Sequence, residues 1–145
     1  MAQNLANAGV YLVQTFFGLY TILIMVRFLM QVAKADYYNP ICQSIVKITD
    51  PAIRPLRSVL PSIYGVDFAT LTVAFGVQLI GVMLIMMLWQ APVFMPIYIA
   101  WVMLGLFSII FSIYFFALII MVISSWIAPH SDHPALSLVT QIVEP

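Results

Sequence analysis

Long apolar runs alternate with short polar segments along the chain, and this pattern predicts the secondary structure. Residues 10–33, 68–89 and 97–128 are almost continuously hydrophobic. Each run is long enough for the roughly 20 helical residues that cross the hydrocarbon layer of a bilayer. We therefore predict an all-α, multi-pass helical membrane protein.

The polar segment between the first two runs, residues 40–61, predicts helices that lie in the plane of the membrane interface. Ile41, Ile45 and Ile48 recur at the spacing of one helix face. The stretch that holds them, residues 40–49, is too short to span a bilayer. An amphipathic helix of this kind lies along the headgroups instead.

A second short helix is expected to begin at Asp50 within the same segment. Asp50 is followed by Pro51, and an acidic cap before a proline is typical of a helix start. Pro55 should disturb the first turns of this helix and Pro61 should end it, because proline lacks the backbone N–H that continues a helix.

The chain resembles itself at an offset of 94 positions. Residues 4–51 align with residues 98–145 without a gap. Identities are sparse, but the prolines that flank an amphipathic decapeptide recur at matching positions, which is typical of a structural repeat. These prolines are Pro40 and Pro51 in the first copy and Pro134 and Pro145 in the second.

We therefore expect two repeat units, residues 1–94 and an incomplete residues 95–145, with the second interfacial segment starting over residues 134–145. A complete unit holds a long span, an interfacial segment rich in proline and arginine, and a second span. Two spans return the chain to its starting side, so the copies would be parallel rather than inverted. We expect the natural chain to continue beyond Pro145 through the missing span; a protein with three spans is the alternative.

The composition agrees with a membrane protein and excludes other classes. Hydrophobic residues make up 64% of the chain and charged residues 7%, which is not typical of soluble domains. The sequence lacks the basic patch that nucleic-acid binding needs, so no nucleic-acid partner is expected. The single cysteine, Cys42, excludes an internal disulfide.

The basic residues predict the orientation in the membrane. Four of the five lie in residues 34–67, whereas the N-terminal segment and the second loop have none. Loops rich in Lys and Arg stay in the cytoplasm. We therefore expect a cytoplasmic loop at residues 34–67 and an N-terminus on the outer side. Two spans later, residues 130–145 are expected in the cytoplasm as well.

Arg27 lies inside the first span, on a stripe with Gln31 and Lys34 near the end of that helix. A charge at the bilayer centre costs a few kcal/mol on insertion scales. The simplest interpretation is a side chain that extends to the interface and places its charge in water. The alternative is a buried ion pair with Asp67 or Asp50.

Other polar residues near the spans are candidate contact sites. Arg54 and Arg57 are three residues apart on one helix face. They could hold lipid phosphates or an acidic partner, or they could act only as topology signals. Gly65 permits a turn, and Asp67 directly precedes the second span, where it is expected to cap the helix.

The second span contains features that favour contact with another helix. Thr72 and Gly76 form a pair of small residues four apart, which allows close helix approach. Gln78, in the middle of the span, is expected to hydrogen-bond a neighbouring helix; lining a pore is the alternative.

Reactive groups in the sequence do not form a recognisable site. His130, Asp132 and His133 lie within four residues, but no helix is expected to fix their spacing and no further ligand lies nearby in the sequence, so they do not resemble a zinc site. The sequence has no phosphate-binding loop, no nucleophile motif and no paired carboxylates within a span. It therefore predicts no catalytic residue, no cofactor, no metal site, and a protein that is not an enzyme.

Several motifs around the polar segment can be compared with a known family. They are Arg27, Tyr38-Asn39-Pro40, Thr49-Asp50-Pro51, Pro55-Leu56-Arg57, Pro61 and Gly65-Val66-Asp67. Together they resemble the YggT family of small bacterial membrane proteins, whose members usually contain two copies of this unit. The chain departs from the family pattern at Tyr64, where a glycine is common, and in lacking the second proline and arginine segment.

The resemblance implies a bacterial inner membrane protein associated with tolerance of osmotic stress or, as in similar chloroplast proteins, with assembly of membrane complexes. We therefore expect a non-enzymatic scaffold or accessory protein that contacts the lipid bilayer and another membrane protein complex or a copy of itself. The alternative is a small channel or transporter subunit in osmotic or ion homeostasis, with Gln14, Arg27, Gln31 and Gln78 along a wet pathway. The candidate structural, lipid or partner contacts are Arg27, Asp50, Arg54, Arg57, Asp67 and Gln78.

Overall fold

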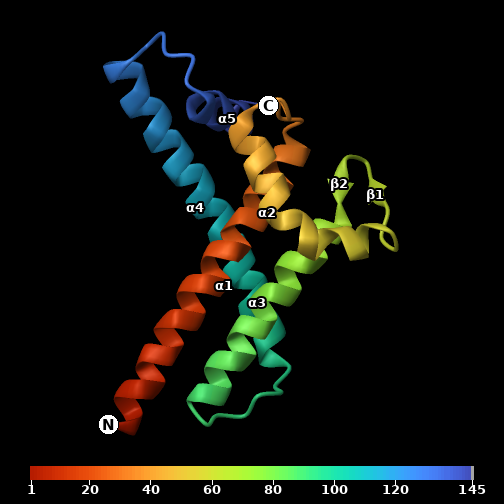
Figure 1. The fold of residues 1–145 in the computed structure, drawn as a ribbon, viewed down its shortest axis with the longest axis vertical. Coiled ribbons are helices and arrows are strands. Elements are labelled where there is room, and N and C mark those ends of the chain that lie inside the picture. Colours follow the sequence, from red (N-terminus) through yellow and green to blue (C-terminus); the bar gives the residue numbers. More distant parts are fainter. Residues whose placement is uncertain (145) are drawn as a thin grey trace.

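The computed structural model describes residues 1–144 and confirms an all-α membrane protein (Figure 1). Three of its helices are long and apolar enough to cross a bilayer. The elements follow in the order α1 (Ala2–Val32), α2 (Pro40–Arg57), β1 (Ser62–Ile63), β2 (Val66–Asp67), α3 (Phe68–Leu88), α4 (Ile97–Ile127) and α5 (Pro134–Val143).

The predicted spans match the observed helices closely, with one exception at the N-terminus. The bounds of α3 and α4 agree with the predicted spans to within one residue. Helix α1 begins at Ala2 instead of residue 10, because the polar residues before the apolar run continue the helix beyond the hydrocarbon. Its 31 residues correspond to about 46 Å at 1.5 Å per residue, which exceeds the thickness of the hydrocarbon layer.

The prediction that a second helix begins at Asp50 is wrong, because α2 is continuous from Pro40 to Arg57. Its cap is Asn39, whose side chain accepts a hydrogen bond from the N–H of Ile41. Pro51 and Pro55 lie inside the helix. Each removes one backbone hydrogen bond, so the helix bends rather than stops, and Figure 1 shows its second half turning away from α1.

A short hairpin follows α2 and leads the chain into α3. Strands β1 and β2 pair antiparallel, with Ile63 opposite Val66. The turn between them has positive φ at both Tyr64 and Gly65, 54° and 80°, as a type I′ turn requires. The predicted turn at Gly65 is thus confirmed, whereas the two strands were not expected from the sequence.

Helices α2 and α5 lie side by side at one end of the molecule, and the N-terminus and the α3–α4 connection lie at the other (Figure 1). The side chain of Asn39 donates to the carbonyl of Pro134 at 2.7 Å, and that of Gln141 accepts from the N–H of Asp36 at 2.8 Å. Like α2, α5 begins at a proline capped by the preceding side chain, here His133. The tandem repeat stays a prediction, and Pro145, its last matched residue, lies outside the described residues.

The core lies where α1, α2, α3 and α4 meet, and a second cluster joins the end of α1 to α2 and α5. The main cluster is formed by Ile24, Met25, Ile53, Ala69, Val73, Ala74, Val102 and Leu106. The second is formed by Leu29, Met30, Ala35, Cys42, Ile45, Leu138 and Ile142. Both clusters include residues of α2, Ile53 in the first and Cys42 and Ile45 in the second, so this helix is part of the packed core.

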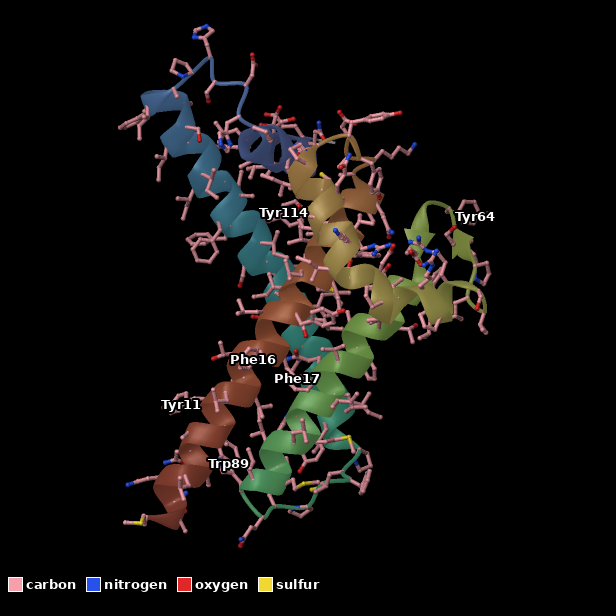
Figure 2. The ribbon with its side chains drawn as sticks, viewed as in Figure 1. Tyr11, Phe16, Phe17, Tyr64, Trp89 and Tyr114 are labelled. Atoms are coloured by element: carbon pink, nitrogen blue, oxygen red, sulfur yellow. The ribbon has the colours of Figure 1, made fainter. Side chains whose placement is uncertain are left out.

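Close approach between helices occurs at Gly81 and not at Thr72 and Gly76. A Cβ added at Gly81 would lie 3.2 Å from the Cβ of Phe17 on α1, and Figure 2 shows Phe17 between α1 and α3. A Cβ at Gly76 would meet nothing within 4 Å, and Thr72 is exposed. Within the described chain, no other helix therefore approaches α3 closely at Thr72 and Gly76.

Replacing Gly81 with valine is expected to lower the free energy of unfolding by about 2 kcal/mol, because overpacking forces α1 and α3 apart. The same substitution at Gly76 is the matched control, and it should change stability by less than about 0.5 kcal/mol. Thermal unfolding in detergent, followed by circular dichroism, measures both variants. Equal losses at the two positions would contradict the observed packing.

Candidate functional site

Arg27 is buried and forms an ion pair with α2. Its side chain is 2% exposed, and Nη1 lies 2.8 Å from Oδ1 of Asp50. The same nitrogen donates to the hydroxyl of Thr49 at 2.8 Å and to the carbonyl of Val46 at 3.2 Å. The interpretation of Arg27 as a side chain that extends to water is therefore wrong, and the alternative pairing with Asp50 is the observed one.

The contacts around Arg27 join α1 to the middle of α2. The hydroxyl of Thr49 donates to the carbonyl of Ile45 at 2.7 Å, which leaves its oxygen free to accept from Arg27. Tyr20, about two turns earlier on α1, donates to the carbonyl of Ile48 at 3.3 Å. The buried, hydrogen-bonded Arg27 therefore fixes the position of α2 against α1.

Asp67 accepts five hydrogen bonds and connects α1, α2 and α3. Oδ2 accepts from Arg57 at 2.6 Å, from Gln31 at 3.1 Å and from the hydroxyl of Thr70 at 3.0 Å. Oδ1 accepts from the N–H groups of Ala69 at 3.0 Å and Thr70 at 3.4 Å, so the predicted cap of α3 is confirmed. We call Gln31, Arg57, Asp67 and Thr70 the Asp67 cluster.

The pKa of Asp67 lies below its ordinary value of 3.8. Burial alone would raise the pKa, because it disfavours the charged carboxylate. Hydrogen bonds from Arg57, Thr70 and Gln31 and the charge of Arg57 outweigh burial. The carboxylate is therefore ionised at neutral pH, as its pairing with Arg57 requires.

The two arginines expected to act together have different surroundings. Arg57 pairs with Asp67, although its side chain remains 49% exposed. Arg54 is exposed and has no ion pair within residues 1–144. Lys47 is exposed on the same outer side of α2, so α2 presents a basic outer face formed by Lys47 and Arg54.

Gln78 faces α4, but within residues 1–144 it does not form the hydrogen bond that was expected. Its Nε2 would lie 3.2 Å from a Cβ at Gly105, so the amide occupies the space that this glycine leaves open. Gln14 and Gln78 both line a cavity of about 110 Å³. Arg27 and Gln31 do not line this cavity. Arg27 is hydrogen-bonded to Thr49, and Gln31 is hydrogen-bonded to Asp67.

A larger cleft lies between the hairpin and the ends of α1 and α2. Its volume is about 560 Å³, and its lining comprises Gln31, Arg57, Leu60, Pro61, Ser62, Gly65 and Asp67. This cleft was not predicted from the sequence. The sequence did indicate its parts, the polar stripe that holds Arg27 and Gln31 and the turn at Gly65. The hairpin brings the two regions together.

Of the residues considered for metal binding, His133 has another role in the described structure. Nδ1 of His133 accepts from the N–H of Ala135 and so caps α5. Among residues 1–144, no group of three or more potential ligand side chains gathers at one point. The site is thus a set of ion pairs and hydrogen bonds at one end of the helices.

Comparisons with known proteins match most of the chain. The model of the CCB3/YggT family matches residues 6–88. The chain is 41% identical over 144 residues to the uncharacterized protein PA0392 of Pseudomonas aeruginosa, a match that covers 98% of this chain and 73% of that protein. It is 34% identical over 141 residues to the uncharacterized protein YggT of Escherichia coli K12, covering 96% of this chain and 72% of that protein. No solved structure matches the chain. The extent of these matches shows that the chain belongs to the CCB3/YggT family.

Proposed function

We propose that the chain is a non-enzymatic scaffold or accessory subunit of a larger complex in the bacterial inner membrane, where it supports complex assembly or tolerance of osmotic stress. The observation that best supports this proposal is that one face of α2 is packed against the spans while the opposite face carries basic side chains that are unpaired within the described chain. Its inner face is buried on the spans and fixed by Arg27 and Asp50, while Lys47 and Arg54 remain on its outer face. A rigid helix with an unpaired basic face suits contact with an acidic partner surface.

The test uses cysteines at opposite ends of the molecule. Lys47→Cys and Gln90→Cys are made in a Cys42→Ala background, and a thiol crosslinker is applied to native membranes. We expect Lys47→Cys to give an adduct of defined mass and Gln90→Cys to give none. Adding Arg54→Glu should lower the adduct yield about tenfold, because a reversed charge repels an acidic partner.

The same two cysteines test the orientation. We propose that the N-terminus is periplasmic and that α2 and α5 are cytoplasmic. A membrane-impermeant thiol reagent should then label Gln90→Cys in spheroplasts and Lys47→Cys only after the membrane is opened. The reverse labelling would contradict the orientation, and a lone monomer with no adduct at Lys47 would contradict the scaffold.

A channel or transporter subunit is the second candidate, because Gln14 and Gln78 line the same cavity between apolar helices. At about 110 Å³ the cavity is small, so conduction would need further subunits. Ion flux through liposomes that contain the purified protein, lost on Gln78→Leu, would favour this candidate over the scaffold.

A further inference from the structure

The β1–β2 hairpin ends in apolar side chains that the rest of the described chain leaves uncovered. Ile63 and Tyr64 are 49% and 102% exposed. A Cβ added at Gly65, the second residue of the turn, would meet nothing within 4 Å. Figure 2 shows Tyr64 at the outer edge of the molecule. We call Ile63 and Tyr64 the hairpin tip, and its side chains are free to contact something outside residues 1–144.

The backbone at Tyr64 gives no reason within the fold for a large aromatic side chain. Its φ is 54°, in the left-handed region that glycine adopts without steric cost and other residues rarely adopt. With its side chain fully exposed, Tyr64 packs against nothing in residues 1–144. A tyrosine at this position therefore indicates a contact outside the described chain.

The hairpin lies close to the level at which the spans end. Strand β2 ends at Asp67, and the apolar span α3 begins at the next residue, Phe68. Tyr64 precedes Asp67 by about 10 Å of extended chain at 3.3 Å per residue. Figure 1 shows the hairpin beside the bundle, lower in the view than α5 and the upper end of α4. The hairpin therefore extends sideways toward lipid rather than out beyond the ends of the helices.

The hairpin also carries polar groups that fit the headgroup layer better than the hydrocarbon. Within the described chain its two strands pair only with each other, so their outer edges lack sheet partners. Unpaired backbone groups are costly in hydrocarbon. Arg57, at the end of α2, is 49% exposed, and basic side chains near a bilayer are attracted to anionic headgroups. Tyrosine is enriched at the same level.

We propose that the hairpin tip is inserted into the headgroup layer of the membrane leaflet beside α3, so that lipid covers Ile63 and Tyr64. The Tyr64 ring lies among the headgroups with its hydroxyl toward water, as an interfacial tyrosine does. This contact anchors the hairpin beside the start of α3. It is separate from the outer face of α2, formed by Lys47 and Arg54, and does not depend on the scaffold function proposed above.

The test measures the depth of a fluorescent label next to the hairpin tip in a bilayer that contains no other protein. Ser62→Cys, an exposed position on β1, is made in the Cys42→Ala background and labelled with the environment-sensitive fluorophore NBD. The protein is placed in nanodiscs of phosphatidylethanolamine and phosphatidylglycerol. Lys47→Cys, on the outer face of α2, is the reference for water, and Phe111→Cys, at an exposed position in the middle of α4, is the reference for hydrocarbon.

Quenchers in water and in lipid distinguish the three depths. We expect the label at Ser62→Cys to be quenched more by a lipid with a nitroxide on its headgroup than by one with a nitroxide deep in its acyl chain. Phe111→Cys should show the reverse order, and Lys47→Cys should be quenched mainly by iodide. Emission from Ser62→Cys should be shifted to shorter wavelength than emission from Lys47→Cys, because the headgroup layer is less polar than water.

A second variant tests whether the native side chains hold the tip in the bilayer. Ile63→Thr and Tyr64→Asn, added together to the labelled Ser62→Cys, remove apolar surface from the tip. Asn-Gly is the favoured sequence for this turn, and threonine is favoured in strands, so the hairpin should still form. Quenching by iodide should rise to the level of the water reference. Ile48→Thr, at an exposed isoleucine of α2, is the matched control and should change nothing.

Quenching at Ser62→Cys that matches the pattern at Lys47→Cys would place the tip in water and overturn the proposal. Quenching that is strongest with the deep nitroxide would overturn the assignment to the headgroup layer. Lipid quenching that persists after Ile63→Thr and Tyr64→Asn would also overturn the proposal, because the label rather than the hairpin tip would then be entering the bilayer.

Discussion

Replacing Asp50 with alanine is expected to lower the free energy of unfolding by about 2 kcal/mol, because it leaves Arg27 buried without a counter-charge. Removing one partner of a fully buried pair costs about 3–5 kcal/mol. The loss should be smaller here because the Asp50 side chain is 43% exposed, so water screens part of the interaction. Thermal unfolding in a non-ionic detergent measures the change.

A double variant separates the ion pair from other effects of the substitution. Arg27→Met with Asp50→Ala removes both charges and keeps an apolar side chain of similar length, so it should recover more than half of the loss. Asp132→Ala, in the exposed connection before α5, is the control and should change stability by less than about 0.5 kcal/mol. A double variant no more stable than Asp50→Ala alone would show that Arg27 does not need its partner.

The pairing of Arg27 shows where prediction from sequence reaches its limit. Insertion energetics identified Arg27 as a residue that needs either water or a carboxylate, and Asp50 and Asp67 were both within reach. The choice depends on the path of α2, which brings Thr49 and Asp50 over α1. That path is set by tertiary contacts that no local pattern contains.

Tertiary contacts also explain why α2 continues through Asp50 as a single helix. Local chemistry favours a helix start at Asp50, because acidic residues before proline are good caps. In the structure the Asp50 carboxylate is used by Arg27 and the backbone passes through Pro51 and Pro55. Burial of Ile45 and Ile53 on the two sides of Pro51 outweighs the lost backbone hydrogen bond.

The apolar spans and the cap of α3 were predictable because each follows from a single local property. Hydrophobic length sets the bounds of α3 and α4, and the position of Asp67 sets the start of α3. Which glycine allows close packing depends on how α1 crosses α3, so the sequence indicated Gly76 where the structure uses Gly81. Likewise, Arg57 meets Asp67 only because the hairpin folds the intervening residues back.

Replacing Asp67 with alanine is expected to cause the largest loss of stability, about 3 kcal/mol, from the lost cap and the buried donors left unpaired, since the half-exposed Arg57 can turn to water. The substitution removes the cap of α3 and leaves Arg57, Gln31 and Thr70 without their acceptor. Asp67→Asn should lose less, because the amide oxygen can still accept from the N–H of Ala69. Thermal unfolding at neutral pH gives the order wild type, Asp67→Asn, Asp67→Ala; an asparagine variant as unstable as the alanine variant would contradict the role of the cap.

The lowered pKa of Asp67 predicts how this loss depends on pH. Because the folded-state pKa lies below 3.8 and the unfolded value is about 3.9, the unfolded chain takes up a proton first as the pH falls. The stabilisation from the charge is therefore complete above about pH 5 and is lost as the pH falls through the folded-state pKa. The stability difference between wild type and Asp67→Asn should shrink between pH 5 and the lowest pH the detergent tolerates. A difference that is constant or grows on acidification would mean that the pairing of Asp67 with Arg57 does not stabilise the folded chain.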